Sequence, residues 1–192
     1  MQRDGMDTAF LALCNDGIPP FIAKYATGLY MAAYTKRVDA SEGFYEALAA
    51  LLGTHFNTAL QTFGALYIAP ENVAPTDLEV LMCQHLCNHG VASARAKYIA
   101  VVHADVFSGR IAATYADLFY AMSALAGQDV PNMLSALSRL VPCAHAETQG
   151  PRVRVAPSEA LGPDHIVHLK CISACELEAW TKTDARKRAR LQ

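Results

Sequence analysis

Charge is scarce in this sequence. Asp, Glu, Lys and Arg make up 18% of the 192 residues, whereas hydrophobic residues make up 53%. This composition excludes a disordered chain and favours one compact domain over residues 1–192 with a sizeable core. A basic excess is also lacking, because the formal net charge is −2. Nucleic-acid-binding domains are typically basic, so we expect no nucleic-acid partner. The basic residues within 184–192 are expected to form a solvated tail.

The sequence also lacks the marks of secretion and of membrane insertion. It does not begin with a charged-then-apolar leader, and four of its six cysteines form i,i+4 pairs within helix-like segments. Both features favour a reducing compartment over a secreted disulfide scaffold. Residues 47–70 carry no charge, but they include His55, Asn57 and Gln61 beside a clear apolar stripe, which is typical of a helix that faces a core. We therefore expect an intracellular, cytoplasmic protein with no integral membrane span.

Catalytic signatures are missing as well. There is no glycine loop of the kind that cradles phosphates, no pair of catalytic carboxylates and no serine elbow. Cys143 and His145 lie two residues apart, but such proximity does not define a nucleophile and its base. The sequence therefore predicts a protein that is not an enzyme and that carries no cofactor.

Strand-like alternation is absent, whereas helix signals recur along the chain. Ser41 caps an amphipathic segment that runs to Tyr67, which Gly53 and Gly64 interrupt, so that a kink or break is allowed there. A capping box begins at Thr76. The predicted helices are 7–16, 21–36, 41–67, 76–88, 93–106, 111–126, 129–141 and 166–180, with a long surface connection at 142–163. The expected fold class is all-α: one domain of about seven to eight helices.

The most apolar of these segments, 111–126, is expected to be the buried central helix of the bundle. Asp117 lies within it, where an ion would need either a partner or exposure to water. Gly109 and Arg110 stand directly before it. A glycine removes a side chain where two helix ends approach closely, and a guanidinium grips a carboxylate with two hydrogen bonds. Either the chain or a ligand must supply that carboxylate, because a buried, unpaired arginine is costly.

Residues 98–102 (YIAVV) and 107–111 (FSGRI) resemble the first homology motif of the apoptosis-regulating B-cell lymphoma two (Bcl) family. In that family, Gly-Arg opens the buried central helix. The Ser-Gly-Arg form looks like some viral members. Residues 59–64 (ALQTFG) are similar to the Leu-x-x-x-Gly core of the third motif and lie at a similar spacing upstream. The resemblance covers roughly residues 59 to 140.

The resemblance implies a Bcl-like bundle that binds amphipathic helices of pro-apoptotic proteins and so blocks cell death. Such helices lay apolar side chains into a hydrophobic groove and offer a carboxylate to the arginine. By this resemblance the groove is lined by Leu60, Phe63, Tyr67, Leu81, Tyr98, Val102, Val106 and Gly109, with Arg110 as the polar clamp. The protein would then act in the cytoplasm and, through its partners, at the mitochondrial surface. Redirection of the same fold to host signalling proteins, or to self-association as a homodimer, stays open as an alternative.

A second alternative is a zinc-stabilised helical protein of a viral or cellular assembly, since thiolates and imidazoles are zinc ligands. Cys83, His85, Cys87 and His89 form one cluster, and residues 165–175 hold another. On one helix, however, the two cysteines share a face that the two histidines do not. A tetrahedral site would need ligands from both clusters, for example Cys83 and Cys87 with His168 and Cys171. We therefore expect buried cysteines and surface histidines, and no metal.

Overall fold

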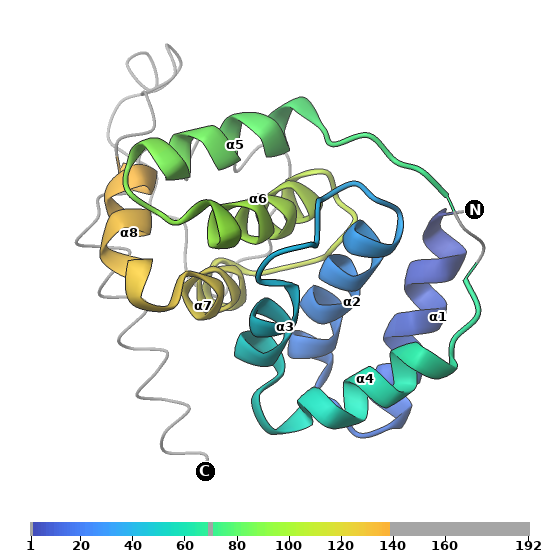
Figure 1. The fold of residues 1–192 in the computed structure, drawn as a ribbon. Coiled ribbons are helices and arrows are strands. Elements are labelled where there is room, and N and C mark those ends of the chain that lie inside the picture. Colours follow the sequence, from blue (N-terminus) through green and yellow to red (C-terminus); the bar gives the residue numbers. More distant parts are fainter. Residues whose placement is uncertain (1, 69–70, 139–192) are drawn as a thin grey trace, which may run out of the picture.

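The computed structural model describes residues 2–68 and 71–138, and within them the chain is helical and contains no strand (Figure 1). The predicted all-α class is therefore confirmed for this part of the molecule. The predicted connection at 142–163, the helix at 166–180, the basic tail, and the residues Cys143, His145, His168 and Cys171 lie outside the described residues.

The described residues contain eight α-helices and two 3₁₀ turns. Their bounds are α1 Gln2–Asn15, α2 Pro20–Tyr34, α3 Phe44–Leu52, η1 Gly53–His55, α4 Phe56–Ala65, α5 Asp77–Asn88, α6 Ser93–Phe107, α7 Tyr115–Ala126, η2 Gly127–Asp129 and α8 Val130–Ser138. The predicted segment 41–67 is broken at Gly53, whose positive φ of 53° favours glycine, whereas α4 continues through Gly64.

Two helices begin with reciprocal caps. In α5 the Thr76 side chain accepts from the backbone N–H of Glu79 and the Glu79 carboxylate accepts from that of Thr76, which confirms the predicted capping box. In α7 the same arrangement joins Thr114 and Asp117. The predicted helix 111–126 therefore begins only at Tyr115, because the cap fixes its start after an irregular connection.

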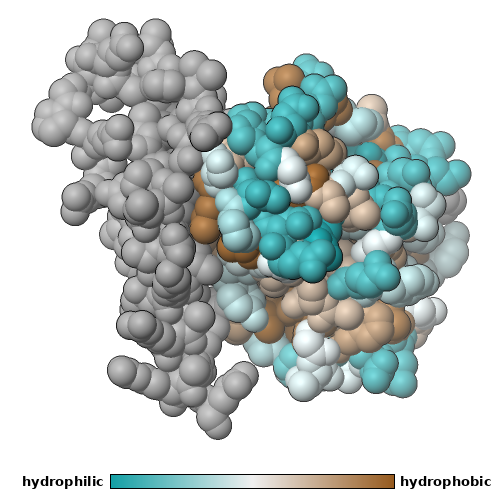
Figure 2. All heavy atoms as spheres, turned by 60° about the vertical axis from the view of Figure 1, so that its left-hand side comes forward, coloured by the Kyte–Doolittle hydropathy of each residue, from teal (hydrophilic) through white to brown (hydrophobic). Residues whose placement is uncertain are grey.

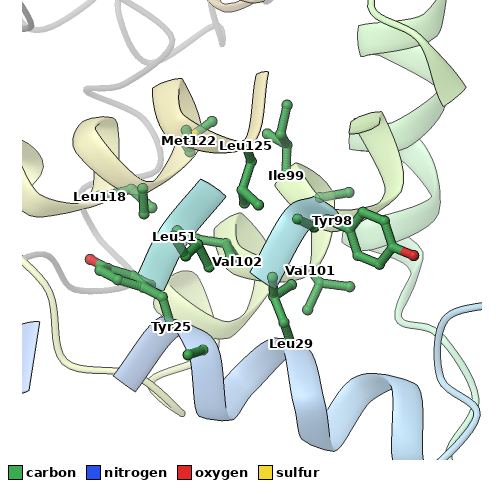
Figure 3. Packing of buried hydrophobic residues seen from close by; sticks show 14 of the residues in the cluster. Tyr25, Leu29, Leu51, Tyr98, Ile99, Val101, Val102, Leu118, Met122 and Leu125 are labelled. Atoms are coloured by element: carbon green, nitrogen blue, oxygen red, sulfur yellow. The ribbon is translucent and has the colours of Figure 1, made fainter. Parts of the chain in front are cut away.

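The central position belongs to α6 and not to the segment 111–126. Every residue of α6 from Tyr98 to Phe107 is buried, and α6 packs against α2, α5 and α7 (Figure 3). In α7, by contrast, Asp117, Tyr120 and Ser123 are only partly buried. The sequence did not indicate that α6 is the central helix, because α6 contains the acidic residue Asp105, which is fully buried in the structure. Burial of that carboxylate is tolerated because an arginine from elsewhere in the chain neutralises it.

The helices α1 to α4 lie on one side of the molecule and α5 to α8 on the other (Figure 1). Residues 71–76, which lead into α5, pass the end of α2, where the Val73 N–H donates to the Thr35 carbonyl at 3.0 Å. On the face shown in Figure 2, hydrophilic and apolar residues are interspersed over the visible part of the described surface. No helix in the described ranges has the length and apolar character needed to cross a bilayer.

Candidate functional site

The Gly-Arg pair lies in the connection between α6 and α7. The helix α6 ends at Phe107, and Gly109 follows with a φ of 77°, a left-handed conformation that favours glycine. The Ile111 N–H then donates back to the Asp105 carbonyl at 3.0 Å. A Cβ at Gly109 would meet no atom within 4 Å. The expectation that Gly109 allows two helix ends to approach closely is therefore wrong, since the glycine is needed for the turn itself.

Close approach instead occurs at Gly28 of α2. A Cβ there would lie 2.9 Å from the Ile111 side chain and 3.1 Å from Asp105 Oδ2. Any larger residue at this position would push against the end of α6 and the Gly-Arg turn. The absence of a side chain at Gly28 therefore sets how near α2 lies to Asp105.

Arg110 finds a carboxylate within the chain. Its Nη1 atom lies 3.4 Å from Asp105 Oδ1, and its side chain remains 31% exposed. A strong charge-assisted hydrogen bond from nitrogen to oxygen is shorter, about 2.7–2.9 Å. Asp105, in contrast, is 1% exposed. Among the described residues Asp105 is thus a weak partner for Arg110, and most of the guanidinium's donors stay available.

The principal partner of Asp105 is Arg37. Arg37 Nη2 lies 2.7 Å from Asp105 Oδ1, and Arg37 Nε lies 2.8 Å from Glu79 Oε2. Together with Arg110 these residues form what we call the buried ion cluster: Arg37, Glu79, Asp105 and Arg110. Three of the four members are buried and Arg110 is partly exposed, and the formal charges of the four sum to zero, so that each buried ion has a partner of opposite charge.

Burial and charge act in opposite directions within this cluster. Burial lowers the pKa of Arg37, but the carboxylates of Asp105 and Glu79 outweigh it and raise that pKa above its ordinary value. Burial raises the pKa of Asp105, and the neighbouring guanidiniums of Arg37 and Arg110 only partly oppose this. Asp105 is therefore the costly member of the cluster, and its ionised form depends on its cationic neighbours.

The end of α2 directs Arg37 inward. Lys36 has a φ of 58°, and it is the non-glycine residue with positive φ in the described ranges. The Lys36 N–H donates to the Ala33 carbonyl, and the Val38 N–H donates to the Ala32 carbonyl. These two bonds close the helix and reverse the chain. The next side chain, that of Arg37, is thereby placed among buried residues.

Beside Arg110 the structure has a cleft of about 940 Å³ between α1, α2 and the connection that follows α6. We call it the α1–α2 cleft. Apolar side chains from all three elements line it together with two accessible cations and a few polar groups. The lining residues are Met6, Asp7, Phe10, Pro20, Phe21, Lys24, Thr27, Gly28, Met31, Thr35, Arg37, Ser108, Gly109, Arg110, Ile111 and Ala112.

The two accessible cations of the cleft differ in how firmly they are held. Lys24 Nζ lies 2.6 Å from Asp117 Oδ2 and donates to the Ala112 carbonyl at 2.8 Å. The Tyr25 hydroxyl also donates to Asp117, so the acid in α7 has the partners that its burial requires. Arg110 has only its long contact to Asp105 among the described residues. Of the two, Arg110 is the cation that is free to meet an external acid.

The cleft wall also contains a buried hydroxyl that has no hydrogen-bond partner within the described part of the chain. This group is Thr27 Oγ1, and the residue is only 1% exposed. An unsatisfied buried hydroxyl costs free energy unless a ligand or water pairs with it. Thr27 is therefore a polar residue of the cleft wall whose hydroxyl is left unpaired by the described residues.

The residues assigned to a groove by resemblance do not share one surface. Tyr98, Val102 and Val106 lie in the core, and Figure 3 labels the first two among the packed hydrophobic residues. Leu60 is partly buried and packs against the core, and Phe63 is buried and stacks on Tyr30. Tyr67 and Leu81, by contrast, are 91% and 63% exposed. Only Gly109 and Arg110 of the set line the α1–α2 cleft.

Sequence analysis missed the rest of this site, namely Met6 and Phe10 of α1, the α2 stripe, and Arg37. The sequence could have indicated a buried, paired arginine at position 37, because Arg37 directly follows an apolar segment just as Arg110 directly precedes one. The same desolvation argument that singled out Arg110 applies to both. Its partners lay 42 and 68 residues away, beyond the reach of local patterns.

The cysteine and histidine cluster on α5 has other neighbours. The pKa of the Cys83 thiol is raised, mainly by burial and then by the neighbouring Cys87. His85 Nε2 lies 2.6 Å from the Ala136 carbonyl, and His89 Nδ1 lies 2.9 Å from the His85 carbonyl. Within residues 2–68 and 71–138 no three His, Cys, Asp or Glu side chains gather to hold a metal ion.

No protein-family model, curated protein or solved structure matches this chain. Residues 2–68 and 71–138 are thus defined by their own features: an all-helical fold with a largely apolar cleft and an arginine at its wall.

Proposed function

We propose that the protein is a non-enzymatic binding protein that receives an amphipathic helix of another polypeptide in the α1–α2 cleft. Arg110 pairs with an acidic side chain of that helix. The observation that carries this proposal is the position of Arg110: it is partly exposed, weakly paired among the described residues, and set in the wall of an apolar cleft. Helix-in-groove recognition uses apolar contacts of this kind, and an exposed guanidinium beside them can add a charge-assisted hydrogen bond to a carboxylate of the helix.

The shape of the cleft supports an elongated occupant. Its α2 wall is a stripe at helical spacing, formed by Phe21, Lys24, Gly28, Met31 and Thr35. At a rise of 1.5 Å per residue this stripe is about 20 Å long, which equals nearly four helical turns. The volume of about 940 Å³ also lies at the upper end of the range for ligand pockets. A helix with apolar residues at positions i, i+3 or i+4, and i+7 matches such a stripe.

The identity of the helix follows from the resemblance to the Bcl family. Its pro-apoptotic partners carry an amphipathic helix with an acidic residue, and sequestering them blocks cell death. Our proposal is that this protein acts in the same way, in the cytoplasm and at the mitochondrial surface. It differs from the family in its groove, because the cleft here uses α1 and α2.

Titration of fluorescent pro-apoptotic peptides tests this function. We expect at least one member of a peptide panel to bind in the micromolar range or better, measured by fluorescence anisotropy. Arg110→Ala should weaken that binding by about 1.5–3 kcal/mol, because a hydrogen bond between charged groups is lost. The helical circular dichroism should stay unchanged, since Arg110 is partly exposed.

Arg95→Ala is the matched control. Arg95 is 36% exposed and also pairs with an acid, Asp129, but it does not line the cleft. Its loss should leave peptide affinity within twofold of the wild type. Absence of binding by the whole panel at tens of micromolar, or equal losses in both arginine variants, would contradict the proposed function.

A further inference from the structure

The buried ion cluster contains one more guanidinium than the proposed binding step uses. Arg37 lies at its centre, with both the Arg37 and Glu79 side chains almost fully buried. It donates to Glu79 through Nε and to Asp105 through Nη2. Arg37 and Arg110 both line the cleft, but Arg37 is far less exposed, and the proposed function, which needs only Arg110, does not explain it.

The two arginines share one carboxylate oxygen. Asp105 Oδ1 accepts from Arg37 at 2.7 Å and from Arg110 at 3.4 Å. The inner bond is the short one, so Asp105 keeps a well-placed counter-ion when Arg110 turns toward the cleft. Without Arg37, Arg110 would be the only cation of the described cluster next to this buried acid. Its departure would then leave an uncompensated buried charge, which is strongly destabilising.

Glu79 keeps Arg37 in this arrangement. The same oxygen, Oε2, accepts from Arg37 Nε at 2.8 Å and from the Thr76 backbone N–H at 3.4 Å. The guanidinium is therefore fixed at two edges, by the start of α5 and by the end of α6. Gly28 holds α2 close enough for this contact, as its Cα would place a Cβ 3.1 Å from Asp105 Oδ2.

We propose that Arg37 is a positioning residue that neutralises Asp105 and so keeps Arg110 available to the acidic side chain of a bound helix. Arg37 itself is only 6% exposed in the cleft wall, so it sets the preference of the cleft for acidic ligands by acting through Asp105 on Arg110. This inference rests on the proposed function and names what sets the selectivity of that site. It predicts that Asp105 and Arg37 affect selectivity in opposite directions, although both belong to one buried cluster.

The test uses a pair of peptides: the tightest binder of the panel, and the same peptide with its aspartate replaced by asparagine. The ratio of their dissociation constants is the acid preference. The full-length wild type should prefer the acidic peptide by about tenfold or more, as expected for a charged hydrogen bond. Arg37→Met should reduce the preference to below about threefold, because Asp105 then retains Arg110.

Asp105→Asn should act in the other direction. It removes the internal competitor of the ligand, so the acid preference should rise at least threefold above that of the wild type. Affinity for the neutral peptide should change by less than twofold in both variants, and Arg95→Ala should change neither value. A purely structural role of the cluster would lower binding of both peptides in both variants.

The outcomes separate the two proposals. If the wild type binds neither peptide, the proposed function fails and the inference fails with it. If the wild type prefers the acidic peptide but Asp105→Asn does not raise that preference, the inference alone is overturned. Should Arg37→Met fail to fold, Asp105→Asn still decides, because its expected effect is a gain that destabilisation does not produce.

Discussion

At the scale of single residues, burial in this protein depends on pairing. Asp105, Glu79 and Arg37 are all nearly inaccessible to water, yet each has a partner of opposite charge. Arg110 has the poorest pairing of the cluster, and it is the member that reaches the cleft. The residue with the least satisfied charge is thus the one placed where a ligand has access to it.

The burial of Tyr98 can be tested through the pH dependence of stability, because burial raises the pKa of its hydroxyl. Its hydroxyl donates to the Glu42 carbonyl at 2.7 Å, and burial, followed by the nearby charges of Asp39, Glu46 and Glu42, raises its pKa to about 12. In the unfolded chain the ordinary value is about 10. Between these two values the unfolded state has lost the proton that the native state keeps, so stability falls as pH rises from 10 to 12.

Comparison of the wild type with Tyr98→Phe isolates this effect. At neutral pH the variant should be less stable by about 1 kcal/mol, because the hydrogen bond to the Glu42 carbonyl is lost. The difference in unfolding free energy should shrink as pH rises through 10 to 12, since only the wild type carries the ionisable group. Urea denaturation at several pH values measures it, and a difference that stays constant over this range would contradict the assignment.

At the scale of elements, the reciprocal caps decide where helices start. Thr114 accepts from the Asp117 N–H at 3.3 Å, and Asp117 accepts from the Thr114 N–H at 3.1 Å. Thr114→Ala should therefore destabilise the protein by about 1 kcal/mol. The midpoint of urea denaturation reports this loss. Thr58→Ala is its control, because Thr58 is exposed within α4 and caps no helix there, and it should be neutral or slightly stabilising.

The sequence predicted the elements better than their arrangement. The capping box at Thr76 and the break at Gly53 were readable, because both are signals within a few residues. The central helix was not predictable in this way. A charged residue such as Asp105 normally indicates an exposed position, and only its buried partner shows otherwise. That partner, Arg37, lies 68 residues away in the sequence. The cleft was missed for the same reason, because α1, α2 and the Gly-Arg turn come together only through tertiary packing.

At the scale of the whole molecule, two surfaces compete as the binding site. One is the α1–α2 cleft, which contains Phe21 at 37% exposure. The alternative is the surface around one of the exposed residues that the resemblance assigns to a groove, Tyr67 or Leu81, which are tested separately. Since Gly109 and Arg110 belong to both descriptions, Arg110 variants alone do not distinguish the surfaces.

Alanine variants on each surface make the distinction. Phe21→Ala should weaken binding of the tightest peptide by about tenfold, because an aromatic ring of the cleft no longer buries area against the ligand. Tyr67→Ala and Leu81→Ala should leave affinity unchanged within twofold. Fluorescence anisotropy measures all three. If Tyr67→Ala or Leu81→Ala weakens binding and Phe21→Ala does not, the peptide does not bind in the α1–α2 cleft.

The double use of Glu79 has a consequence for how this molecule tolerates change. A helix start usually frays on its own, and a mutation there is felt only locally. Here one oxygen serves both the first turn of α5 and the guanidinium behind the cleft. Loosening that turn removes an acceptor from Arg37, so a remote backbone defect reaches Arg37 and, through Asp105, the more exposed Arg110. Inherited substitutions at these positions are consequently expected to survive in compensating sets and seldom one at a time.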